Sequence, residues 1–238
     1  KEAFRKIKVY ENNVNIYFNK INSIKGLQLK DLWQDYISYQ NIPNFLFFKD
    51  KYTINDSILD LFKRVILEDI PKLKPTFADF TKIERLILRL AGSDEINPEK
   101  LAGVIGVKQS DINELIDILA KAELLNVLLP FGGLDTKIVK NKKAFFMSPS
   151  LRLALLSQIY NLNIPEMYES KLYEDIVIMY LRKTLNSNIF FSFKQENKNP
   201  DFIIETMDKP IALEVGKGKT NTSQLLNIDA RYGILVTN

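Results

Sequence analysis

Two acidic residues, Asp201 and Glu214, stand beside two short apolar segments near the C-terminus. Asp201 opens the segment 202–204, Glu214 lies near the end of the segment 211–215, and the residues between are typical of a polar turn. If the two segments are paired strands, both carboxylates can share one divalent cation. The spacing therefore predicts a metal site suited to phosphodiester chemistry.

The same segments resemble the PD-(D/E)xK signature of restriction-endonuclease-like folds, in which a lysine two residues after the second acid stabilises charge on the scissile phosphate. Here that position is Gly216. In a regular strand Lys217 would face the opposite side, whereas a bulge at Gly216 would let Lys217 or Lys219 supply the charge. We therefore expect weak divalent-metal binding with little or no DNA cleavage.

Composition restricts the chemistry to carboxylates, lysines and hydroxyls. The 238 residues include no cysteine and no histidine, which excludes thiolate sites and the commonest general base. A net charge of +4 permits nucleic-acid contact, but 33 basic residues against 29 acidic ones is a mild excess. Without a signal peptide or an apolar run of membrane length, the chain is predicted to be a cytoplasmic fragment of a longer polypeptide, with no membrane contact.

The expected fold class is α/β, beginning with a helical lead-in over residues 1–80. Apolar spacing predicts helices from Leu27 to Tyr39 and from Asn55 or Asp56 to Ile70, each followed by proline. The alternation at 14–18 is compatible with a short strand.

Residues 81–152 are predicted to form a winged helix-turn-helix. The capping patterns Thr81 to Glu84, Asn97-Pro98 and Asp111 to Glu114 open three short helices. A hairpin wing between 127–129 and 144–147 follows them.

The predicted wing is basic, whereas the third helix of this region is acidic. Acidic side chains repel phosphates and argue against deep reading of bases, so contact with the DNA backbone is expected from the wing. The candidate nucleic-acid-binding residues are Lys137, Lys140, Lys142 and Lys143.

Residues 153–238 are predicted to form a PD-(D/E)xK nuclease-like domain with a small mixed sheet, truncated at its C-terminus. A helix over 168–185 precedes three strands, at 189–194, 201–205 and 211–215, and a helix at 224–230 and a strand at 232–237 follow. Helix, three strands, helix, strand is the core order of a restriction-endonuclease-like domain.

A succession of motifs resembles the C-terminal region of prokaryotic AAA+ ATPases that carry a winged helix and a PD-(D/E)xK nuclease-like domain of unknown function. The motifs are Leu67-Glu68-Asp69-Ile70, 101–107, 172–177, 200–204 and Leu213-Glu214-Val215.

This resemblance implies that Glu174, Asp201 and Glu214 are the metal positions for Mg²⁺ or Mn²⁺. It also implies an N-terminal ATPase module that binds ATP. The phosphate-binding loop of such a module is absent from this sequence, so the chain itself is not expected to bind ATP.

Three functions stay open. The favoured one is a partner-recognition region, binding DNA through the winged helix and coupled to the ATPase, with a degenerate nuclease-like domain. The second is a Mg²⁺-dependent DNA nuclease that uses Glu174, Asp201 and Glu214 as ligands and Lys217 as stabiliser. The third is a protein-interaction module. Convergence of the Lys217 ammonium group on Asp201 and Glu214 would favour the enzyme, and divergence would favour the degenerate scaffold.

Overall fold

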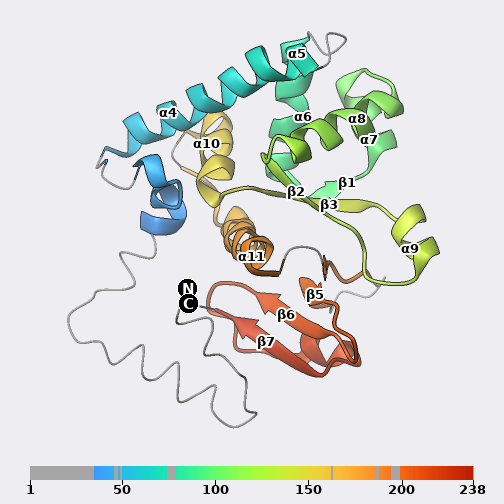
Figure 1. Ribbon diagram of the computed structural model, residues 1–238. Coiled ribbons are helices and arrows are strands. Elements are labelled where there is room, and N and C mark those ends of the chain that lie inside the picture. Colours follow the sequence, from blue (N-terminus) through green and yellow to red (C-terminus); the bar gives the residue numbers. More distant parts are fainter. Residues whose placement is uncertain are drawn as a thin grey trace. The chain divides into compact units, whose positions relative to one another are not determined.

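Figure 1 shows the computed structural model of the chain. The structure describes residues 35–45, 48, 50–73, 79–161, 163–185, 188–193 and 199–237. The strand predicted at 14–18 and most of the helix predicted from Leu27 lie outside these residues. Tyr36–Asn238 form one compact unit with a mixed α/β structure. Within the described residues, no helix is both long enough and apolar enough to cross a membrane.

The helical lead-in is built around a helix that begins earlier than predicted. The Asp50 carboxylate accepts a hydrogen bond from Thr53 N at 2.8 Å, so this helix begins at Lys51 and not at Asn55 or Asp56. It packs against α10 (Pro149–Tyr160) through its buried apolar face. The elements are η1 (Tyr36–Gln40), η2 (Pro43–Phe45), α4 (Lys51–Arg64), η3 (Val65–Asp69) and α5 (Ile70–Leu73).

Three further helices and a small sheet follow, in the order expected from the capping patterns. The helices are α6 (Phe80–Gly92), α7 (Pro98–Ile105) and α8 (Gln109–Lys121). The strands β1 (Glu95–Ile96), β2 (Leu125–Leu128) and β3 (Lys142–Phe146) form an antiparallel sheet in the order β1-β3-β2.

Two of the three predicted helix starts need correction. Asn97 caps α7 as predicted, and its side chain accepts from Lys100 N at 2.9 Å. The cap of α6, however, is Asp79 and not Thr81, because the Asp79 side chain accepts from Lys82 N. Helix α8 begins at Gln109, and Asp111 instead accepts from Lys108 N at 3.2 Å within the first turn.

The connection between β2 and β3 contains a helix that the sequence did not predict. The strands pair antiparallel with Leu125 opposite Phe146, as expected for a hairpin. Between them lies α9 (Leu134–Val139), which begins directly after Gly133 (Figure 1).

The C-terminal part places a long helix against a mixed sheet. The elements are η5 (Glu166–Tyr168), α11 (Glu169–Leu185), β4 (Ile189–Phe190), β5 (Phe202–Ile204), β6 (Ile211–Val215), η6 (Ser223–Asn227) and β7 (Tyr232–Val236). The sheet order is β4-β5-β6-β7, antiparallel except for the parallel pair β6 and β7. Helix α11 packs against β3, β4 and β6. The helix predicted at 224–230 is a short 3-10 helix, η6.

The two sheets meet through backbone contacts beyond β2. Phe131 N donates to Phe191 O at 2.8 Å, and Phe191 N donates to Leu129 O at 3.2 Å. The rings of Phe145 and Phe202 lie 5.2 Å apart, which adds an aromatic contact between β3 and β5. The predicted domain boundary between 152 and 153 falls inside α10.

Candidate functional site

Asp201 and Glu214 lie on neighbouring strands of the C-terminal sheet. Phe202 pairs with Leu213, so one residue further along the same register Asp201 comes opposite Glu214. The Asp201 carboxylate also accepts a hydrogen bond from Val215 N at 2.8 Å, which fixes its orientation at the strand start. Antiparallel pairing thus brings together the two carboxylates that the sequence singled out.

Lys219 supplies the ammonium group at this pair of carboxylates. Its Nζ donates to Glu214 Oε1 and lies 3.8 Å from Asp201 Oδ2. The side chain crosses Gly216 so closely that a Cβ atom there would lie 2.6 Å from Lys219 Cε. Glycine at 216 therefore leaves the space through which Lys219 reaches the acids.

Lys217, the stabiliser named for an active enzyme, points elsewhere. Strand β6 ends at Val215, and Gly216 N donates to Val236 O at 3.0 Å at the end of the parallel ladder of β6 and β7. Lys217 Nζ instead donates to Glu169 Oε2 at 2.8 Å, at the start of α11. The strand does not extend to Lys217, which lies in the turn after β6, so this turn and not strand alternation directs its side chain away from the two acids.

Glu174, the third predicted acid, projects from α11 and interacts electrostatically with Asp201. Burial, followed by the negative charges of Asp201 and Asp94, raises the pKa of Glu174 to about 8, against the opposing charges of Lys143 and Lys171. Burial also raises the pKa of Asp201 and that of Glu214, and Lys219 opposes both shifts. The three acids therefore share a poorly solvated region in which added positive charge is favourable.

The surroundings of Glu214 complete the geometry of this acidic cluster, formed by Glu174, Asp201 and Glu214. Glu214 is only 1% exposed. With its amide nitrogen facing the carboxylate, Gln224 of η6 donates to Glu214 Oε2 at 2.9 Å. Across the described residues, no group of three or more acidic side chains is close enough to hold a metal ion. A metal site formed by Glu174, Asp201 and Glu214 together stays a prediction. The geometry shows two carboxylates, Asp201 and Glu214, around the Lys219 ammonium group.

The raised pKa of Glu174 predicts a pH-dependent stability. The folded-state pKa of about 8 exceeds the usual 4.5, so the contribution of Glu174 to stability is complete below pH 4.5 and is lost as the pH rises through 8. In EDTA, the free energy of unfolding of Glu174→Gln relative to that of the wild type should rise by a few kcal/mol between pH 5 and pH 8, as measured by urea unfolding. Glu99→Gln removes the same charge from an exposed position on α7 as the matched control. A stability difference independent of pH would contradict this account.

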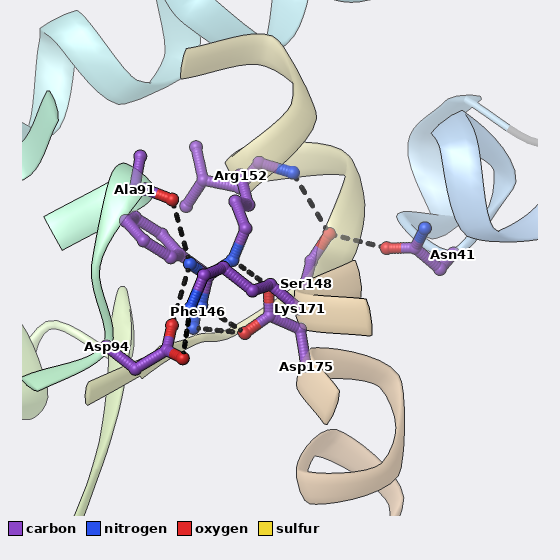
Figure 2. A network of polar contacts seen from close by, with 9 residues as sticks. Asn41, Ala91, Asp94, Phe146, Ser148, Arg152, Lys171 and Asp175 are labelled. Carbon is purple, nitrogen blue, oxygen red and sulfur yellow. Dashed lines mark hydrogen bonds and ion pairs between the residues drawn. The ribbon is translucent and has the colours of Figure 1, made fainter. Parts of the chain in front are cut away.

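A buried ion pair holds the first turns of α11 (Figure 2). Arg152 of α10 is 0% exposed and donates to Asp175 through Nε at 2.6 Å and Nη2 at 2.9 Å. Asp175 also accepts from Phe146 N at 2.8 Å, at the end of β3. Asp175 directly follows Glu174, so this pair fixes the helix that presents Glu174.

The same network extends to the end of α6. Arg152 Nη1 donates to Ala91 O at 2.9 Å and lies 3.1 Å from Asp94 Oδ1. Lys171 Nζ, one turn before Glu174 and Asp175, lies 2.5 Å from Asp94 Oδ2 (Figure 2). Arg152 was not singled out in the sequence, although Ser148-Pro149 is a start signal for the helix that carries it.

The predicted nucleic-acid-binding lysines do not lie on a simple loop. Lys137 belongs to α9, Lys140 directly follows it, and Lys142 and Lys143 begin β3. Lys142 and Lys143 are consecutive strand residues and therefore face opposite sides of the sheet.

Three comparisons place the chain among known proteins. It is 25% identical to an uncharacterized protein, MJ1637, of Methanocaldococcus jannaschii, over an alignment covering 96% of this chain and 50% of that protein. The chain thus spans about half the length of this relative. The crystal structure of RV1404 from Mycobacterium tuberculosis matches at 15% identity with a TM-score of 0.24, covering 58% of this chain and 97% of that chain. The family described as Domain of unknown function (DUF8612) matches residues 33–161, more than half of the chain, and the chain belongs to this family.

Proposed function

We propose that the acidic cluster is a site for metal-dependent hydrolysis of phosphodiester bonds in nucleic acid. The contact of the Lys219 ammonium group with Asp201 and Glu214 carries the proposal. The PD-(D/E)xK signature lacks its lysine at Gly216, and Lys219 crosses that glycine to reach the same two acids. The order α11, β4, β5, β6, η6, β7, with only the last pair of strands parallel, supports a restriction-endonuclease-like core.

The residues fit a divalent cation held by two carboxylates. Mg²⁺ commonly takes only one or two carboxylates from a protein and completes its shell with water and phosphate oxygens. Asp201 and Glu214 would provide these carboxylates, and their raised pKa values reflect poor solvation that a cation would relieve. When bound, Mg²⁺ or Mn²⁺ would supply an activated water and Lewis acidity.

The remaining residues have separate tasks in this proposal. Lys219 would stabilise negative charge on the phosphate, because its ammonium group lies beside the two carboxylates that would hold the cation. Gln224 would orient Glu214 through its amide hydrogen bond. Arg152 would act only indirectly, by holding Asp175 and hence the turn of α11 that carries Glu174.

A cleavage assay tests the site directly. The wild-type chain should nick plasmid DNA or linearise single-stranded circular DNA in Mn²⁺ or Mg²⁺ and not in EDTA. Asp201→Asn removes a carboxylate charge and should reduce the rate about 100-fold or more, with loss of Mn²⁺ binding by calorimetry. Asp208→Asn, an exposed acid in the turn between β5 and β6, is the matched control. Cleavage that is absent, or unaffected by Asp201→Asn, would argue against the proposal.

A second candidate, favoured by the divergence of Lys217 from Asp201 and Glu214, is a recognition region without nuclease chemistry. Lys219 already neutralises charge at Asp201 and Glu214, which would stabilise a degenerate site without metal. The order of α6, α7, α8 and the β2–β3 hairpin is compatible with a winged helix that contacts DNA or protein. The longer relative leaves room for a further module such as an ATPase. DNA binding without metal-dependent cleavage would favour this candidate.

A further inference from the structure

Helix α9 exposes apolar side chains that the described fold does not use. Leu134, Ile138 and Val139 are 73%, 70% and 75% exposed, and α9 has no buried residue. The helix lies between β2 and β3 (Figure 1). Three exposed aliphatic residues within six positions of one short helix form a surface that favours contact with a ligand.

The same segment carries lysines held against a row of phenylalanine rings. Lys137 Nζ lies 4.1 Å from the ring centroid of Phe190, and Lys140 Nζ lies 5.0 Å from that of Phe193. Contacts of this kind attract an ammonium group to the face of an aromatic ring. They orient the ammonium groups before any ligand binds. Lys137 also lies 3.8 Å from Glu205, so a phosphate would compete with that acid.

A third lysine connects this row with the acidic cluster. Lys143 Nζ lies 5.4 Å from the ring centroid of Phe191. Its charge also acts on Glu174 and Asp201, where it opposes the larger effect of burial on the pKa of each. Lys137, Lys140 and Lys143, which we call the lysine row, each lie over one ring of the segment 190–193, and Lys143 is the member whose charge acts on the acids.

We propose that α9 and the lysine row bind a single-stranded segment of nucleic acid and direct it into the acidic cluster. This inference rests on the proposed function. Lysines along the row suit successive phosphates, whereas the aliphatic residues of α9 suit the faces of unstacked bases. In a regular duplex the base faces are covered by stacking, so Leu134, Ile138 and Val139 would have no apolar surface to contact. The phenylalanine rings lie under the lysines and do not serve as base platforms.

Binding measured without metal tests this inference independently of cleavage. In EDTA, fluorescence anisotropy with a labelled 20-nucleotide single strand and the matching duplex would compare the wild type with the triple variant Leu134→Ser, Ile138→Ser, Val139→Ser. We expect single-strand affinity to fall about tenfold and duplex affinity to stay unchanged. The double variant Lys137→Ala, Lys140→Ala should reduce the salt slope on the single strand by about 1.4, at about 0.7 per phosphate.

Matched controls separate α9 from general surface effects. Leu61→Ser, Leu67→Ser, Val104→Ser changes three other exposed apolar residues. Lys100→Ala, Lys121→Ala removes two exposed lysines from α7 and α8. Both controls should bind like the wild type, and circular dichroism should show all variants folded.

The outcomes distinguish the two proposals. Unchanged single-strand affinity in the α9 variants, equal loss on the duplex, or absence of nucleic-acid binding would overturn the inference and assign α9 to another partner. Selective single-strand binding without cleavage in Mn²⁺ would uphold it and contradict the proposed hydrolysis alone.

Discussion

Arg152→Ala is expected to lower the free energy of unfolding by about 3–5 kcal/mol, because it removes one partner of a buried ion pair. The guanidinium group makes two hydrogen bonds to Asp175 and one to Ala91 O, with no exposed surface. Its loss leaves the Asp175 carboxylate buried without its counter-charge. Urea unfolding followed by circular dichroism measures the effect, and Arg85→Ala, on the exposed side of α6, is the control.

The pH dependence distinguishes a lost charge partner from a simple cavity. Burial raises the pKa of Asp175 to about 6 even though Arg152 opposes the shift, and removing Arg152 raises it further. A raised folded-state pKa means that stability falls as the pH rises, so the Arg152→Ala deficit should be smaller at pH 5 than at pH 8. A deficit below about 1 kcal/mol, or one independent of pH, would contradict the assigned role.

Elements with local start and stop signals were predictable from the sequence. Asn97-Pro98 and Gly106 bound α7, and Gly106 takes the left-handed conformation, with φ of 76°, that ends a helix. The strands around Asp201 and Glu214 also follow from their apolar runs and the turn between them. In these places a few adjacent residues determine the structure.

The elements that were missed lack a recognisable helical period, although α10 has a start signal at Ser148-Pro149. Helix α10 is buried around most of its circumference, so its apolar residues show no single face and Arg152 resembles a surface residue in the sequence. Helix α9 follows two glycines that read as a turn, and its six residues are too few to establish a helical period.

The pairing of the two acids in the candidate site could be predicted from the sequence, whereas the position of its lysine could not. Strand pairing places Asp201 opposite Glu214, whereas Lys217 lies in the turn after β6 and pairs with Glu169. The path of Lys219 back across Gly216 depends on the loop after β6, which no periodic pattern specifies. The sequence left Lys217 and Lys219 as alternatives, and the structure places Lys219 at the acids.

Lys219→Ala is expected to reduce metal-dependent cleavage about 100-fold or more, because it removes the cation that stabilises the phosphate in the transition state. The affinity for Mn²⁺ should increase. Lys219 Nζ contacts both Asp201 and Glu214, so its removal leaves their charges available to Mn²⁺. Calorimetry with Mn²⁺ and plasmid nicking measure the two effects on the same protein. Lys217→Ala, which removes an ammonium group paired with Glu169, should leave both nearly unchanged.

A lysine introduced at position 216 tests the role of the ammonium group that Lys219 supplies. The Lys219 side chain occupies the space beside Gly216, so Gly216→Lys alone should displace it and weaken activity. In the Lys219→Ala background that space is free, and Gly216→Lys places the lysine two residues after Glu214, where the PD-(D/E)xK signature has it. The double variant should cleave at least about tenfold faster than Lys219→Ala alone. Gly216→Gln in the same background should not cleave faster. Equal activity of the lysine and glutamine variants would show that Lys219 only packs against Gly216 and does not assist hydrolysis.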